Sequence, residues 1–207
     1  MPPKQGRPPK KGRRDEILKA GYAEFAAEGF HLARLDRVAD RAGVAKGTIY
    51  IYFESKEQLF EAAVRARVSP ILGRVIRLTE YYPGPTKFLL RMLFRLVHQR
   101  MAEGELRTIF KIMIAEGDRF PDLLEFYYTE FVSKMLEQLE RIVERGVARG
   151  ELRAGAATSL PIVLISPGVM GMVWSLTFER YKPLEQDALV AAHIDLVMNG
   201  VSVARDT

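Results

Sequence analysis

The sequence has 207 residues, 48% of them hydrophobic, which is enough to bury a sizeable core. It contains no cysteine, which excludes a disulfide framework, a thiolate zinc site and a thiol nucleophile. The formal net charge is +5, but the first 14 residues alone hold six Lys and Arg and no acid, and the rest of the chain is close to neutral. A basic arm beside a nearly neutral body predicts a localised contact with a polyanion.

The amino-terminal segment is predicted to be a disordered arm followed by a helix. Residues 1–12 are rich in proline and lysine and cannot build a core. Apolar residues then recur at helical spacing from about residue 13 to residue 28, and Gly29 is expected to end this helix. No apolar stretch precedes Ile17, so we expect no secretory signal and a cytoplasmic protein.

Two short helices are predicted next, over residues 35–42 and 46–53, and a long helix follows them. Gly43 tolerates the left-handed conformation that closes the first short helix. Ser55 is a good N-cap for the long helix, and Gln58 stands three residues later, as in a capping box.

The rest of the chain has the pattern of long helices separated by proline and glycine. We expect these helices at about residues 86–102, 105–115, 121–149, 157–181 and 184–201. No segment alternates with a period of two over a useful length, so no sheet is expected. The prediction is an all-α fold of about nine helices: three in a small head, one connector and five in a larger body.

One segment raises the question of a membrane span, because no charged residue occurs from Ala154 to Phe178. Pro161 and Pro167 interrupt it, together with several Gly, Ser and Thr, and no basic cluster flanks one side. We therefore favour a buried helix that faces another subunit, with a membrane-tethered regulator as an alternative.

The segment from Leu35 to Phe60 has the dimensions of a helix-turn-helix. Val38, Ala39 and Ile49 would hold the two short helices together. The side chains left outside are phosphate and base-edge donors, and a second helix presented in this way fits the major groove of DNA. The alternative is a helical hairpin with a solvated basic face.

The stretch from Val38 to Phe60, Val-Ala-Asp-Arg-Ala-Gly-Val-Ala-Lys-Gly-Thr-Ile-Tyr-Ile-Tyr-Phe-Glu-Ser-Lys-Glu-Gln-Leu-Phe, resembles the head pattern of the TetR family of transcriptional regulators almost throughout. The segment from Ala26 to Phe30 is similar as well. The resemblance covers roughly residues 13–62, whereas the body is similar only in helix lengths and size. It implies a homodimeric repressor with an arm at 1–12, a DNA-binding domain at 13–56 and a ligand-binding and dimerisation domain at 57–207.

The resemblance also implies roles for single residues. Lys46 and Gly47 would face base edges or the DNA backbone, and Tyr52 would lie near the bases. Thr48 and Tyr50 would bind phosphates, as would a lysine at the start of the next helix. The predicted DNA-binding set is Arg7, Arg34, Arg37, Ala45, Lys46, Gly47, Thr48, Tyr50, Tyr52 and Lys56.

The sequence departs from the family pattern just before the first short helix, where Ala33 and Arg34 replace the usual Thr and Ser or Thr. This change removes an N-cap hydroxyl, which is worth about 0.5–2 kcal/mol. It also exchanges a hydroxyl for a guanidinium as the phosphate donor. Arg7 in the arm has two interpretations: insertion into a narrow A·T minor groove, or part of a solvated basic tail.

The body is expected to hold an elongated, mostly apolar pocket, since the resemblance implies a small-molecule effector that releases a palindromic operator. Its predicted lining consists of methionine, aromatic and branched side chains: Phe88, Met92, Phe110, Met113, Ile114, Tyr127, Phe131, Met170, Trp174 and Phe178. The candidate polar anchors are Arg95, His98, Glu116 and Asp118. A body without a cavity would instead indicate a ligand-independent DNA-binding or architectural protein.

The last two predicted helices are the expected dimer face. They combine the uncharged segment 154–178 with an apolar stripe that includes Leu189, Ile194 and Val197. Two such helices from each subunit would form a four-helix bundle across a two-fold axis.

No pattern in the sequence points to catalysis, a metal or a cofactor. His31, His98 and His193 fall on separate predicted helices without ligand spacing. There is also no phosphate-cradling glycine loop and no nucleophile elbow.

Overall fold

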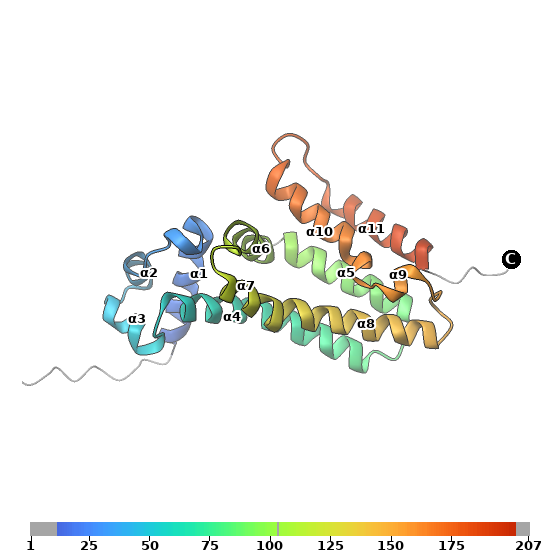
Figure 1. Ribbon diagram of the computed structural model, residues 1–207, viewed down its shortest axis with the longest axis horizontal. Helices are drawn as coiled ribbons and strands as arrows, with labels where there is room; N and C mark the ends of the chain where they lie inside the picture. The colour runs from blue at the N-terminus through green and yellow to red at the C-terminus, as the bar shows by residue number, and fades with distance from the viewer. Residues whose placement is uncertain (1–11, 103, 202–207) are drawn as a thin grey trace, which may run out of the picture.

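The computed structural model describes residues 12–102 and 104–201, and within these ranges the chain forms helices and no sheet (Figure 1). The arm, including Arg7, lies outside the described residues. A small head at one end contains α1 (Arg13–Leu32), α2 (Leu35–Ala42) and α3 (Lys46–Tyr52). The long helix α4 (Lys56–Tyr81) begins in this head and continues into the body.

The body packs its helices around the second half of α4. In chain order they are α5 (Thr86–Ala102), α6 (Glu105–Glu116), α7 (Pro121–Tyr127), a π-helical turn η1 (Tyr128–Val132), α8 (Ser133–Ala148), the short α9 (Ala156–Ser159), α10 (Ile162–Thr177) and α11 (Gln186–Val201). Helices α10 and α11 lie beside each other at the side of the body away from α8 (Figure 1).

Three details of the predicted helices are wrong. Gly29 does not end the first helix but kinks it, because the chain continues to Leu32 beyond a φ of 78° and ψ of 174°. The helix predicted over 121–149 is divided by the π-helical turn η1. The helix predicted over 157–181 is broken at Leu160 and Pro161, and α10 ends at Thr177.

None of the described helices is long and apolar enough to cross a membrane. The break at Leu160 and Pro161 is the physical reason, since it divides the uncharged segment into α9 and α10.

The hydrophobic core of the head continues into the body. Phe25, Phe30 and Phe60 pack as a ring cluster, with Phe60 edge-on to both neighbours at centroid distances of 5.0 and 5.2 Å. Phe120, from the connection between α6 and α7, packs edge-on against Phe30 at 4.8 Å. The same core includes buried residues of α6, α7 and η1, whereas α5, α8 and α11 build a second core. The head is therefore fixed to the part of the body that contains α6 and α7.

Candidate DNA-binding surface and body cavity

The turn between α2 and α3 is closed by its backbone. Gly43 adopts φ 62° and ψ 41°, its N–H donates to the carbonyl of Asp40 at 3.2 Å, and the N–H of Val44 donates to the carbonyl of Ala39 at 3.0 Å. Val38 and Ile49 are fully buried and hold the two helices together. Helix α3 is thereby held rigidly against the head, with only one of its residues buried.

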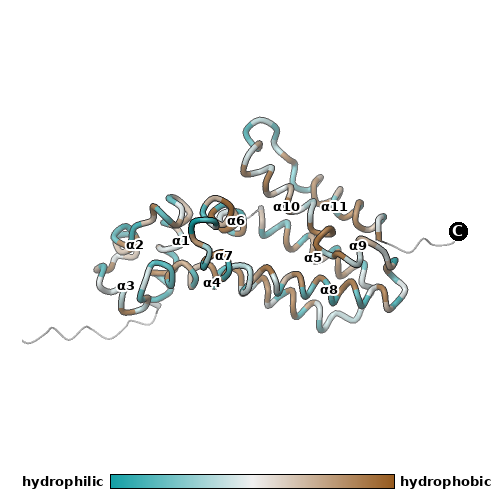
Figure 2. Tube along the Cα trace, in the orientation of Figure 1, coloured by the Kyte–Doolittle hydropathy of each residue, from teal (hydrophilic) through white to brown (hydrophobic). Residues whose placement is uncertain are grey.

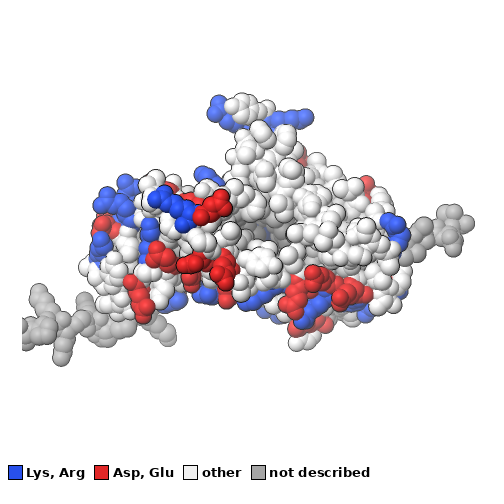
Figure 3. Space-filling view, viewed as in Figure 1, with Lys and Arg blue, Asp and Glu red and all other residues white. Residues whose placement is uncertain are grey.

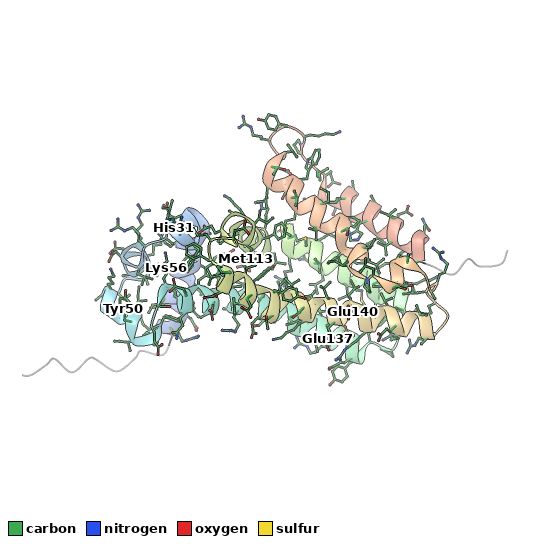
Figure 4. All side chains as sticks on the ribbon, viewed as in Figure 1. His31, Tyr50, Lys56, Met113, Glu137 and Glu140 are labelled. Atoms are coloured by element: carbon green, nitrogen blue, oxygen red, sulfur yellow. The ribbon has the colours of Figure 1, made fainter. Side chains whose placement is uncertain are left out.

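The outer face of α3 carries most of the side chains expected to touch DNA. Ala45, Lys46, Gly47 and Tyr50 are exposed, and Figure 4 shows Tyr50 at the outer edge of the head. Thr48 and Tyr52 are half-buried at the side of the same helix, and Arg34 and Arg37 are exposed next to it. The structure thus places these eight predicted residues on one end of the molecule, where Lys and Arg gather at the edge of the head in Figure 3.

Lys46 is held by an ion pair in the absence of DNA. Its Nζ lies 2.9 Å from Oδ1 of Asp36, and Arg34 approaches the same carboxylate at 3.6 Å. The hydrogen bond between the two side chains raises the pKa of Lys46 and lowers the pKa of Asp36. The ion pair with Asp36 therefore competes with contacts from Lys46 to a phosphate or a base edge.

A buried carboxylate joins α1 to α2. Glu24 is fully buried, and it accepts hydrogen bonds from Nε of Arg41 at 3.2 Å and from the backbone N–H of Arg34 at 3.4 Å. Arg37 donates to Glu28 at 2.6 Å. Arg34 is the N-cap residue of α2 and supplies no side-chain cap, as expected from its replacement of a hydroxyl. Glu24 accepts from a different donor, the backbone N–H of Arg34 itself, in a long-range contact that the local pattern does not reveal.

In the structure Lys56 binds backbone carbonyls of the head, which differs from the predicted phosphate contact. Its ammonium donates to the backbone carbonyls of Phe30, His31 and Ala33 at 2.9, 3.0 and 3.4 Å. It also lies 4.6 Å from the centre of the Phe30 ring, and Figure 4 shows Lys56 reaching toward His31. Because an ammonium has three N–H donors, all are occupied within the head. Lys56 fastens the end of α1 to the start of α4, and we leave it out of the proposed DNA contacts.

The end of α1 is also fastened to the body, by Glu116 at the end of α6. Its two carboxylate oxygens accept from the backbone N–H of Phe30 at 2.8 Å and of His31 at 2.6 Å. The kink at Gly29 exposes these two N–H groups by interrupting the helix just before them. Glu116 was predicted as a possible polar anchor for a ligand, and this prediction is wrong because the side chain is engaged at the head–body junction.

The body contains a cavity of about 530 Å³ with an almost entirely apolar wall. Four of the predicted residues lie in this wall, namely Phe110, Tyr127, Phe131 and Met170. The cavity adjoins both cores, since its wall includes Leu106 from the core shared with the head and Leu139 from the second core.

Six of the predicted lining residues lie elsewhere. Phe88, Met92 and Ile114 are exposed on the outer faces of their helices, and Phe178 is exposed just beyond the end of α10. Trp174 donates its indole N–H to the carbonyl of Lys182 at 2.8 Å. Met113 is buried in the core shared with the head, and Figure 4 shows it on α6 near the junction. The other candidate anchors, Arg95 and Asp118, are exposed and do not line the cavity.

Most of the lining residues that the sequence did not indicate come from α5, α8 and α10, and others come from α4 and α11. Ile71 and Val75 of α4 line the cavity, and they lie on the helix that begins in the head. His98, named above as a candidate anchor, does line the cavity, together with His193 of α11. The two histidines are 95 residues apart, so only the fold brings them together.

An apolar surface covers part of α10 and α11. Ile162, Val163, Met170 and Leu196 are all exposed, with between 47 and 64% of each residue accessible. Figure 2 shows apolar residues following one another along both helices, and Figure 3 shows few charges over them. An apolar patch of this kind on an isolated chain is typical of an association surface.

Comparison with known proteins gives matches along both parts of the chain. Residues 17–63 match the family described as "Bacterial regulatory proteins, tetR family", and residues 89–196, about half of the chain, match "Tetracyclin repressor-like, C-terminal domain".

Full-length relatives and a solved structure agree with these matches. The HTH-type transcriptional repressor KstR2 of Mycolicibacterium smegmatis is 26% identical over 197 residues, covering 92% of this chain and 91% of the relative. The fatty acid metabolism regulator protein of Bacillus subtilis is 22% identical over 188 residues, covering 90% of this chain and 94% of the relative. The crystal structure of the transcriptional regulator FadR from Bacillus subtilis in complex with stearoyl-CoA has a TM-score of 0.77 at 20% identity, covering 90% of this chain and 98% of that one. At this identity the structural likeness establishes the fold.

Proposed function

Because this chain belongs to the TetR family of bacterial regulatory proteins, we propose that it is a homodimeric repressor that is released from a palindromic operator by an apolar effector. As a family member it is a DNA-binding transcriptional regulator and not an enzyme. A regulator of this kind works where the chromosome lies, which supports a place in the cytoplasm.

One observation carries the proposal: the same side chains wall the cavity and support the head. Leu106, Tyr127 and Phe131 line the cavity and belong to the hydrophobic core that contains Phe30 and Ile49. A ligand that repositions these residues changes the side-chain packing that supports α1 and α3 in the head. The ligand acts to the extent that it binds the DNA-free arrangement more tightly than the DNA-bound one.

On the DNA side, we propose that α3 enters the major groove. The proposed contacts are the exposed or half-exposed predicted residues of the head, together with the arm residue: Arg7, Arg34, Arg37, Ala45, Lys46, Gly47, Thr48, Tyr50 and Tyr52. Lysine and arginine supply affinity through the phosphates, while the side chains at the start of the helix select bases.

A pair of heads is needed to bind a palindromic operator, and α10 and α11 offer the surface for pairing. Their exposed apolar residues would be buried between two copies in a four-helix arrangement. Two-fold symmetry would then place the two α3 helices on successive major grooves.

The cavity favours a small, largely apolar effector. Its volume of about 530 Å³ lies in the range of small-molecule sites. The FadR structure described above holds stearoyl-CoA, a ligand with a long acyl chain, which agrees with an apolar ligand in this fold. The presence of a cavity weighs against the alternative of a ligand-independent architectural protein.

The DNA-binding proposal is tested by selection from a random pool of duplex DNA, followed by affinity measurements on the selected sequence. The wild-type protein is expected to enrich a palindrome. Lys46→Ala should weaken binding about tenfold and reduce the slope of log affinity against log salt by about one. Lys134→Ala, which removes the same charge from the body, serves as the control. Failure of the wild type to enrich any sequence at low salt would contradict the proposal.

Asp36→Asn is expected to strengthen operator binding by roughly twofold to fivefold, since the ion pair with Lys46 no longer competes with DNA. Fluorescence anisotropy with the selected duplex measures the change. Asp187→Asn removes an equal charge from the start of α11, far from the head. An equal gain in both variants would mean that total charge, and not the release of Lys46, determines the affinity.

A further inference from the structure

Two histidines form a hydrogen-bonded chain across three helices of the body. His98 of α5 and His193 of α11 are each only 3% exposed. Nε2 of His98 lies 2.8 Å from Nδ1 of His193, and Nε2 of His193 lies 2.7 Å from the carbonyl oxygen of Leu164 on α10. Both rings form part of the wall of the cavity. The Cα of Gly168 faces them closely, since a Cβ there would lie 3.5 Å from Nε2 of His98.

The carbonyl at one end fixes the direction of this chain. A carbonyl oxygen only accepts, so Nε2 of His193 carries the proton and donates. Burial lowers the pKa of His193 and lowers the pKa of His98 to about 4, so both rings are neutral near pH 7. In a neutral ring the second nitrogen has a lone pair, so Nδ1 of His193 accepts from the Nε2–H of His98.

The same rule leaves Nδ1 of His98 without a proton. This nitrogen has no hydrogen-bond partner among the described residues. A ligand that supplies a donor to this nitrogen is therefore favoured over one that does not, because it satisfies an acceptor that no described protein group pairs.

The other polar groups of the wall do not select for a donor. The hydroxyl of Ser166 already donates to the carbonyl of Ile162 at 3.2 Å, and because Ser166 is exposed, water can satisfy the acceptor capacity that its oxygen keeps. The hydroxyl of Tyr127 can rotate, and it serves either as a donor or as an acceptor. His98 is therefore the group in this wall that distinguishes a ligand donor from a ligand acceptor.

We propose that Nδ1 of His98 accepts a hydrogen bond from a neutral hydroxyl group of the effector, which is otherwise an apolar molecule. This inference rests on the proposed function of the cavity and defines the chemical class of its ligand as an apolar alcohol. The apolar wall binds the hydrocarbon part, and the histidine chain sets the position and the donor character of the single polar group. An ionised carboxylate would meet a lone pair at this nitrogen and is disfavoured.

The test uses two isomers of the same size, decan-1-ol and 1-methoxynonane, of which only the alcohol donates a hydrogen bond. Isothermal titration calorimetry with the full-length protein is expected to show about tenfold or tighter binding of the alcohol. Decanoic acid at pH 8 is expected to bind more weakly than the alcohol. The His98→Phe variant should bind the ether as the wild type does but lose the preference for the alcohol.

Two further variants make the result specific. His98→Gln keeps a donor toward His193 and a free acceptor, so part of the preference for the alcohol should return. Ser166→Ala removes a wall hydroxyl that is already paired and should leave the preference unchanged. If the wild type binds both isomers equally, or the acid more tightly than the alcohol, the hydroxyl proposal is overturned while the apolar cavity remains a ligand site. If neither isomer binds, both the hydroxyl proposal and the proposed effector site are contradicted.

Discussion

Glu116→Gln is expected to lower the free energy of unfolding by about 2–4 kcal/mol, although the side chain keeps its shape. Each carboxylate oxygen of Glu116 accepts from one backbone N–H, that of Phe30 or that of His31. A glutamine has only one acceptor oxygen, and its amide NH₂ would face the second N–H as a donor against a donor. The variant therefore loses one hydrogen bond and the charge that strengthens the other.

Urea unfolding measures the stability, and amide hydrogen exchange at Phe30 and His31 reports the junction directly. Both amides should exchange faster in the variant. Glu125→Gln, which removes an equal charge from an exposed position on α7, should change neither quantity. Unchanged exchange at both amides would show that Glu116 does not hold the head to the body.

The head could be predicted from the sequence because its signals are local. Apolar spacing, the turn glycine at position 43 and the cap at Ser55 lie within a few residues of the elements they define. The structure confirms this cap, since Ser55 Oγ accepts from the N–H of Gln58 at 3.2 Å. The expected exposure of Lys46 and Tyr50 follows from the same spacing, once Ile49 is assigned to the core.

The cavity could be predicted only in part because its wall depends on how helices are rotated against one another. Helix α10 carries no charged side chain, so its sequence does not reveal that Leu164 and Met172 are buried while Val163 and Met170 are exposed. Periodicity identifies a buried face where a polar face contrasts with it. Without that contrast the inward side is decided by the neighbouring helices.

The junction between head and body could not be predicted because its partners are backbone groups. Lys56 bonds to carbonyls and Glu116 to N–H groups of the same segment, around Phe30 and His31. The family resemblance assigned Lys56 to a phosphate, and Glu116 was named only as one of four candidate polar anchors for a ligand. Gly29 is the one local signal of the junction, since a glycine before an aromatic residue permits the kink that frees these N–H groups.

Gly29→Ala is expected to be the most damaging single substitution at this junction, lowering the free energy of unfolding by more than about 3 kcal/mol. Gly29 has a φ of 78° and a ψ of 174°, a backbone conformation that only glycine adopts readily. A Cβ at this position would also collide with Oε1 of Glu116, so the carboxylate would have to leave the two N–H groups. Gly73→Ala in α4, where the nearest atom to the added Cβ is 3.7 Å away, should instead be neutral or stabilise by about 0.5–1 kcal/mol.

A double-mutant cycle with Glu116→Ala separates the two causes of this loss. In a protein that already lacks the Glu116 side chain, Gly29→Ala adds only the backbone strain. The collision with the carboxylate and the loss of its hydrogen bonds then have no further effect on stability. The combined variant should therefore be less destabilised than the sum of the single variants, by about 1–3 kcal/mol in urea unfolding. Additive losses would mean that the strain at Gly29 acts independently of Glu116. The kink would then be a local feature of α1, and the head would depend on the shared aromatic core alone for its attachment to α6.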